Sequence, residues 1–219
     1  MTDITTHRDI VEKMPRAMQN RPRSKKTGYP VPWFVPFNPA INDYDFRFMG
    51  REKIDLAVRE ELCWTCGEPL GSLPVAFVIG PMCAVNRISS EPPSHVECGI
   101  YAAKACPFLA RPKMERPSGH SGIVQEEGIA GVASMRNPGV ALVWVTMRPT
   151  WMSAIRLFDI GDPERALWFA HSRKATREEV EESIDTGYPD LMKLAVDDGP
   201  EAIAELEAKL VVAKELLPA

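Results

Sequence analysis

The sequence of 219 residues lacks a hydrophobic run long enough to cross a bilayer, which takes about 20 apolar residues. Its apolar runs, such as residues 140–145, are short. The first residues include Asp3 and Asp9 and no apolar signal segment. We therefore expect no contact with a membrane and a cytoplasmic location, where thiols stay reduced.

Familiar catalytic patterns are also missing. No lysine follows a glycine run as in a P-loop, no Rossmann glycine pattern occurs, and no Ser-His-Asp order can be singled out. Whether the protein is an enzyme therefore stays open. The chain has only five cysteines, which in a reducing compartment are free thiols or metal ligands rather than a disulfide framework.

The composition that is present, 45% hydrophobic and 26% charged residues, is that of a globular protein with a real core. The net charge of -4 is unevenly distributed. Residues 1–26 hold seven Lys/Arg against three Asp/Glu, whereas residues 174–219 hold five against twelve. The basic N-terminal arm could bind a phosphate backbone, or it could be a solvated, flexible leader.

We expect an α+β fold, with a zinc module on a mainly antiparallel sheet and a C-terminal helical tail, in one compact domain. Five segments make it up: a basic arm and Pro/aromatic strap (1–48), a helix plus zinc-binding module (49–108), a flexible loop (109–128), an antiparallel sheet (129–173) and an acidic helical tail (174–219).

Periodicity and turn residues locate the main elements. Apolar residues four apart predict a helix over residues 51–62. Ser94 and Glu97 have the spacing of a capping box, which predicts a helix that ends before Pro107. Strand-like composition marks residues 75–80, 129–135 and 139–147, and a hairpin is predicted from 155–160 and 166–170.

The tail is predicted to be helical. Thr176 and Glu179 form a second capping box, Gly187 is expected to end that helix, and a short helix fits residues 190–196. The Gly199-Pro200 pair begins the last helix. We expect one face of that helix to pack on the protein's own sheet, through Ile203, Leu206, Leu210 and Leu217.

Two pairs of residues predict a metal site. Cys63 and Cys66 are separated by two residues and followed by Gly67, which is the form of a zinc knuckle. His95 and Cys98 form the second pair, in the first turn of the predicted helix, where the helix dipole stabilises an anionic centre. Zinc with these four ligands is the leading interpretation; an iron-sulfur cluster and a redox Cys-x-x-Cys are the alternatives.

The order of knuckle, β segment and helix over residues 63–106 resembles the treble-clef zinc finger. That resemblance implies one structural zinc ion with no open coordination position. The 28 residues between the two pairs are long for the motif, and Cys83 or Cys106 could replace His95. At the level of the whole chain, residues 28–35, 63–71 and 80–87 resemble segments of uncharacterised proteins from bacteria and their phages.

Four other residues are candidates for binding an anionic ligand. Asn86 and Arg87 lie between the ligand pairs, where Arg87 could bind a phosphate and Asn86 could instead cap the following turn. His171 and Arg173 precede the Thr176 cap, near a helix N-terminus. For the histidine, the sequence favours a surface or capping role over an acid-base role.

We therefore expect a zinc-binding cytoplasmic accessory protein that contacts nucleic acid or a nucleic-acid complex. The arm and basic residues near the finger would make that contact: Arg87, Lys104, Arg111 and Lys113. One alternative is a protein-interaction adaptor that uses the acidic tail and exposed aromatic residues. The other is an enzyme with a pocket near Asn86 and Arg87.

Overall fold

The computed structural model describes residues 14–46, 48–106, 109, 123–124, 133–134 and 137–219. The helices are α2 (Arg16–Gln19), α3 (Arg51–Arg59), α4 (Pro81–Asn86), α5 (Val96–Ala105), α7 (Arg177–Asp198) and α8 (Pro200–Glu215). The strands are β1 (Phe37–Asn38), β2 (Asp43–Tyr44), β3 (Val75–Ile79), β4 (Ile88–Ser89), β5 (Ile123–Val124), β6 (Ala133–Ser134), β7 (Ala141–Thr146), β8 (Thr150–Met152), β9 (Leu157–Asp159), β10 (Pro163–Ala170) and β11 (Arg173–Lys174). The mixed α+β class with antiparallel sheets and C-terminal helices is confirmed.

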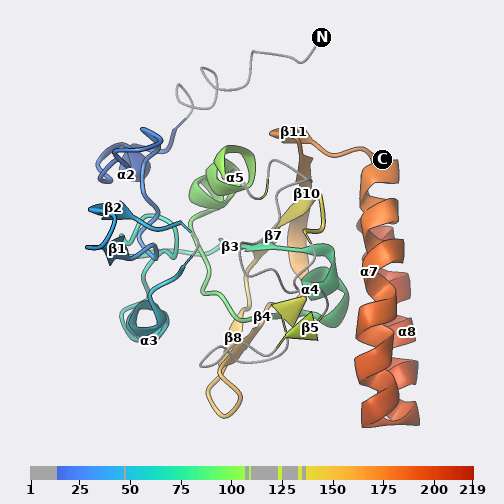
Figure 1. Ribbon diagram of the computed structural model, residues 1–219. Coiled ribbons are helices and arrows are strands. Elements are labelled where there is room, and N and C mark those ends of the chain that lie inside the picture. Colours follow the sequence, from blue (N-terminus) through green and yellow to red (C-terminus); the bar gives the residue numbers. More distant parts are fainter. Residues whose placement is uncertain (1–13, 47, 107–108, 110–122, 125–132, 135–136) are drawn as a thin grey trace.

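The central sheet has the strand order β11-β10-β7-β3, and every pair in it is antiparallel. All six residues of β7 are buried because both faces of this strand are covered. Ala141, Val143 and Val145 pack on the α5 side, and Leu142 and Trp144 pack on the opposite side, toward α4 and α7. Figure 1 shows the two helical layers on either side of the sheet.

The predicted hairpin over residues 155–170 is wrong, although both of its segments contain strands. β9 joins a separate three-stranded sheet of order β4-β9-β8, and Phe158 there pairs with Trp151 and Ser89. β10 pairs with β7 and β11 instead. Strand composition identifies the strands but not their partners, because partners are chosen by how the side chains pack across sheets.

The C-terminal helices differ from the prediction at one point. The Thr176–Glu179 capping box is confirmed, with both of its hydrogen bonds present, and α8 begins at Pro200 as expected. However, α7 continues past Gly187 and Pro189 to Asp198, so the predicted end and the separate helix over 190–196 are wrong. Packing of Tyr188, Leu191 and Met192 against α4 and α8 outweighs the low helix propensity of glycine and proline.

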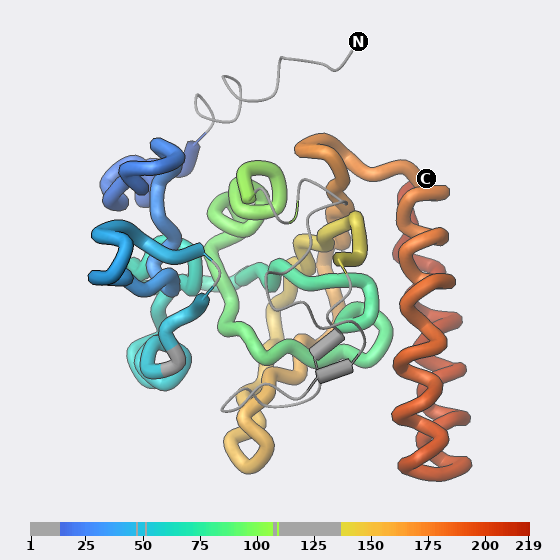
Figure 2. The backbone as a smooth tube through the Cα atoms, viewed as in Figure 1, coloured from blue at the N-terminus to red at the C-terminus, as the bar shows by residue number. Residues whose placement is uncertain are grey.

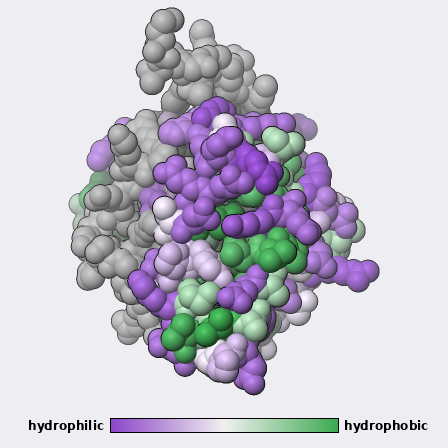
Figure 3. All heavy atoms as spheres, turned by 90° about the vertical axis from the view of Figure 1, so that its right-hand side faces the viewer, coloured by the Kyte–Doolittle hydropathy of each residue, from purple (hydrophilic) through white to green (hydrophobic). Residues whose placement is uncertain are grey.

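The helical stripe of α8 packs within the protein. Ile203, Leu206 and Leu210 contact the α4 and α7 core, and Leu217 contacts the main core. The indole Nε1 of Trp168 donates to the carbonyl oxygen of Leu216 at 2.8 Å, which ties the end of the chain to the sheet. Figure 3 views this side and shows a largely hydrophilic surface with smaller hydrophobic areas between.

The N-terminal strap, residues 20–42, folds back on itself between Arg23 and Pro30, and β1 near its end pairs with β2, which follows it. Val31 and Val35 are fully buried. The ring of Phe34 stacks on Trp64 at 5.0 Å between centroids, and Trp33 meets the same ring edge-on at 6.1 Å. The strap and the C-terminal helices lie on opposite sides of the sheet, as Figure 2 shows. The predicted loop 109–128 lies almost wholly outside the described residues.

Candidate metal centre

The two predicted ligand pairs come together in space. The ligand atoms of Cys63, Cys66, His95 and Cys98 all lie within 4.8 Å of one another, so this group could hold a metal ion. The side chains of Cys63 and Cys98 are fully buried and that of Cys66 nearly so. Buried thiols gathered this closely, without a disulfide among them, are the arrangement that a soft divalent cation prefers.

The first pair lies in a tight knuckle that follows α3. The amide of Cys63 donates to the Glu68 carbonyl at 2.8 Å, and the amide of Leu70 donates to the Glu61 carbonyl at 2.8 Å. Leu62 forms a bridge with Pro69. This pairing ends α3 at Arg59, three residues before the predicted end, because Leu62 cannot serve both the helix and the knuckle.

Gly67 is required at the turn of this knuckle. Its φ of +81° lies in the left-handed region, and a Cβ built there would lie 2.3 Å from the ring of Trp33. Trp33 is also bound through its backbone, since its amide donates to the Thr65 carbonyl at 2.7 Å. The strap therefore closes directly over the knuckle.

Backbone amides point at the sulfur of Cys63. The amide of Cys66 lies 3.5 Å from the Cys63 Sγ, and the amide of His95, from the other pair, lies 3.3 Å from it. Hydrogen bonds of this kind favour the thiolate, which is the form that binds a metal.

The second pair lies at the start of α5. His95 is the N-cap residue and Cys98 is in the first turn, as predicted. The predicted capping box is wrong, because no side chain caps this helix. The Ser94 hydroxyl is used elsewhere: it accepts from the Thr65 amide at 3.2 Å and lies 2.8 Å from the Thr65 hydroxyl, which joins the two ligand pairs.

The orientation of His95 presents one nitrogen to the cysteines. Its Nε2 lies 3.0 Å from the carbonyl oxygen of Pro69, and its Nδ1 lies 3.5 Å from the sulfur of Cys66 and 3.8 Å from that of Cys98. Around a tetrahedral zinc ion, with its usual bond lengths, a nitrogen and a sulfur lie about 3.6 Å apart. The separations in this protein fit that geometry.

The thiols influence one another's ionisation. Hydrogen bonds from the side chains of Cys66 and Cys98 hold the pKa of Cys63 far below its usual range. Donation to Cys63 raises the pKa of Cys66 to about 11 and also raises the pKa of Cys98. These hydrogen bonds favour ionisation of Cys63, and a divalent cation bound here would favour the thiolate form of all three cysteines.

The two alternative cysteines lie elsewhere. Cys83 is in α4 and packs against the main core, where burial raises the pKa of its thiol to about 11. Cys106 is the C-cap of α5, at the opposite end of that helix from His95. Neither belongs to the group of four.

The metal centre lies between parts of the chain that are far apart in sequence. Met14 and Met18 of the N-terminal segment pack with Cys63, Cys66 and Cys98. α5 packs on β3 and β7 through its other face. No spacing in the sequence indicates the contribution of these methionines, of Trp33 or of the Pro69 carbonyl, because each acts through the tertiary fold.

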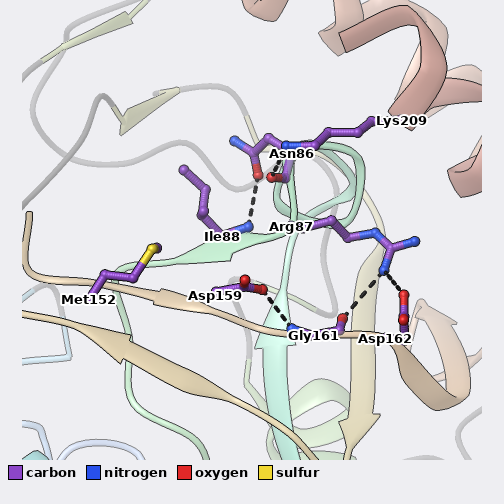
Figure 4. A pocket seen from close by; sticks show the side chains of 8 residues that line it. All are labelled: Asn86, Arg87, Ile88, Met152, Asp159, Gly161, Asp162 and Lys209. Carbon is purple, nitrogen blue, oxygen red and sulfur yellow. Dashed lines mark hydrogen bonds and ion pairs between the residues drawn. The ribbon is translucent and has the colours of Figure 1, made fainter. Parts of the chain in front are cut away.

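Asn86 and Arg87 line a hollow of about 420 Å³, together with residues of β4, β8, β9, the following turn and α8 (Figure 4). The Asn86 side chain accepts from the Ile88 amide at 3.2 Å and so caps the turn. Arg87 donates to the Gly161 carbonyl at 3.3 Å and to Asp162 at 3.1 Å, and its guanidinium lies over the Trp144 ring. Both hydrogen bonds come from Nη1, whereas the buried Nε of Arg87 has no hydrogen-bond partner among the described residues.

His171 and Arg173 lie at the β10-β11 turn, beside the N-terminus of α7. Arg173 forms a two-point ion pair with Glu179, at 2.7 and 2.9 Å, and His171 Nε2 lies 3.9 Å from the same carboxylate. An anion bound at this place would have to displace Glu179, which also completes the capping box.

Of the basic residues expected near the finger, some are described by the structure and others are not. Lys104 lies over the ring of Phe169, and Arg111 and Lys113 lie outside the described residues. Among the described residues of the N-terminal segment, 14–46 and 48–50, four cationic side chains are exposed: Arg16, Arg23, Lys25 and Lys26.

Comparison with protein families, with curated proteins and with solved structures finds no match for this chain. Within the part of the chain that the structure describes, no helix has the length and apolar character to cross a membrane. The centre therefore has to be interpreted from its own geometry.

Proposed function

We propose that this protein binds one zinc ion through Cys63, Cys66, His95 and Cys98, and that the ion is structural. The observation that carries the proposal is the convergence of three thiols and one correctly oriented imidazole within 4.8 Å. Three thiolates and one nitrogen complete a tetrahedral shell, which leaves no position for a substrate. The order of knuckle and helix supports a treble-clef-like arrangement.

The proposed role of the ion is to hold the N-terminal segment against the sheet. The knuckle binds the strap, α2 packs on the ligands, and α5 carries the other two ligands. An ion at this junction contributes to folding directly, because its ligands are brought together only by the fold. Thiolate ligands require a reducing compartment, so a cytoplasmic location belongs to this proposal. The bacterial or phage origin stays a prediction.

Elemental analysis of protein purified without added metal tests the zinc proposal. We expect about one equivalent of zinc in the wild type, according to the stoichiometry of a four-ligand site. Cys98→Ala should lose the metal, and Cys83→Ala, which removes a buried thiol outside the centre, should keep it. Iron with visible absorbance, or a metal-free wild type that folds normally, would overturn the proposal.

We further propose that the zinc-held N-terminal segment contacts nucleic acid. The support is the set of exposed cations that follows α2, since lysine and arginine bind phosphates by displacing counterions. A steep fall in affinity for labelled oligonucleotides with rising salt is the expected result. The Lys25→Gln, Lys26→Gln variant should flatten that dependence, whereas Lys193→Gln on α7 should not. Absence of binding at low salt would contradict this part.

A further inference from the structure

The segment from Met14 to Gly50 exposes cations but no carboxylate. Its sequence contains six Lys/Arg and only two Asp/Glu, which are Asp43 and Asp45. Both acids are buried, with exposed fractions of 7% and 4%. The surface of this segment therefore has a positive character that the net charge of the chain conceals.

Asp43 holds the cationic loop against the β1-β2 hairpin. Its carboxylate accepts from the Ser24 hydroxyl at 2.9 Å, from the Lys25 amide at 3.2 Å and from the Lys26 amide at 3.0 Å. The backbone of the loop is thus fixed on β2, while both lysine side chains remain exposed. Phosphate ligands would meet a preorganised loop rather than a disordered arm.

Exposed aromatic rings lie on the same hairpin and just after it. Phe37 is 48% exposed, Phe46 is 41% exposed and Phe48 is 56% exposed. The Phe37 ring meets Tyr44 edge-on across the hairpin, at 5.4 Å between centroids, so its orientation is held. In Figure 1 this hairpin lies on the side of the molecule opposite α7 and α8, away from the acidic tail.

Cations and exposed flat rings on one segment of the chain are the combination that single-stranded nucleic acids require. Their phosphates need positive charge, and their unpaired bases stack on aromatic side chains. In a duplex the faces of the bases are stacked and inaccessible, so only its phosphates could bind the surface, through the lysines. An acidic protein would use the charges but would have no special need for aromatic rather than aliphatic side chains.

We propose that this basic aromatic surface, made by Arg23, Lys25, Lys26, Phe37 and Phe46, binds single-stranded nucleic acid. Phosphates contact the three cations, and bases stack on the two phenylalanine rings. This inference rests on the proposed nucleic-acid function and adds the class of nucleic acid and the residues that select it.

Fluorescence anisotropy tests the inference with two labelled ligands. One is a thymidine oligonucleotide of about 12 nucleotides, which is within the usual site size, and the other is a duplex of the same length. We expect tighter binding of the single strand. The Phe37→Ala, Phe46→Ala variant should weaken single-strand binding by about tenfold or more and leave duplex binding unchanged. The matched control is Val211→Ala, Val212→Ala, which removes exposed apolar side chains from α8 and should bind as the wild type does.

The possible failures can be told apart. Equal affinity for both oligonucleotides, unchanged by the phenylalanine substitutions, would overturn the inference and leave the nucleic-acid function in place. No binding of either oligonucleotide at low salt would overturn both the inference and the proposed nucleic-acid function. The zinc content of the same variants is measured as well. A variant that keeps its zinc has kept its fold, and the result tests the zinc proposal independently of the inference and of the nucleic-acid function.

Discussion

The Nε2 atom of His95 lies 3.0 Å from the carbonyl oxygen of Pro69, in the same knuckle that supplies Cys63 and Cys66. A carbonyl oxygen only accepts, so Nε2 carries the proton and Nδ1 presents its lone pair to the sulfur atoms. The knuckle therefore carries two of the proposed ligands and orients a third, because a carbonyl bound to the other ring nitrogen fixes the imidazole.

Substitution of His95 tests this assignment. We expect His95→Ala to weaken zinc binding by more than about 100-fold, since even the loss of a group that only hydrogen-bonds to a ligand costs about 10- to 100-fold. His95→Cys should retain tight binding, because a thiolate can complete the shell. Competition with a chromophoric chelator measures the zinc affinity of both variants. Wild-type affinity in His95→Ala would mean that the fourth ligand is another group.

Gly67 and Gly71 form a matched pair for testing the contact between strap and knuckle. Both have positive φ, but only at Gly67 does a Cβ meet the Trp33 ring; nothing lies within 4 Å at Gly71. We expect Gly71→Ala to lower the free energy of unfolding by about 1 kcal/mol through backbone strain. Gly67→Ala should lower it by about 3 kcal/mol, because the ring must also move. Urea unfolding of zinc-loaded protein measures both, and equal losses would contradict the close contact.

Acid should reveal the contribution of Asp43. Burial of its carboxyl opposes ionisation, but hydrogen bonds from Lys26, Tyr44, Ser24 and Lys25 outweigh this and lower the pKa to about 2. The pKa in the unfolded chain is about 3.9. Asp43 therefore stabilises the fold above about pH 4, and this contribution is lost as the pH falls toward 2.

The corresponding measurement is the melting temperature of Asp43→Asn against the wild type. The variant should melt lower at neutral pH, and the difference should shrink as the pH falls from about 4 to about 2. Asp55→Asn, which removes an exposed ion pair with Arg156, is the control and should change little at any pH. A constant difference across this range would contradict the role assigned to Asp43.

Pro189 interrupts the hydrogen-bond ladder of α7 at an exposed position. Proline has no amide to donate and costs about 3 kcal/mol in a helix interior. We expect Pro189→Ala to raise the free energy of unfolding by about 1 kcal/mol or more, as measured by urea unfolding, with Glu182→Ala as a near-neutral control. A loss of stability would show that the helix packs on α4 and α8 only when bent at this residue.

The four residues that the structure brings together could be predicted from the sequence because the patterns that identify them are local. Cys63 and Cys66 are three positions apart, as are His95 and Cys98, and each pair is adjacent to a glycine or a helix start. The same holds for the Thr176–Glu179 capping box and for the buried run that became β7. In each case the pattern and the structure that it forms lie within one element.

The errors arose where distant partners decide the structure. Ser94 has the right spacing for a cap, yet its hydroxyl is taken by Thr65, 29 residues away. Gly187 has the composition of a helix end, yet α8 packs against that helix and keeps it continuous. Residues 155–170 contain two strands, but these find partners in two different sheets. Spacing along a chain carries no information on such competition.

The 28 residues that separate Cys66 from His95 form β3, α4 and β4, so the two halves of the metal centre meet only after this much of the fold is in place. In the proposed zinc site, the two cysteines of the knuckle are close enough in sequence to bind an ion while the chain is still unfolded. A zinc ion taken up early would close a loop when α5 arrives, and so remove chain entropy as a cross-link does. We expect such an ion to exchange rapidly during folding and very slowly afterwards, when its release requires the sheet to open.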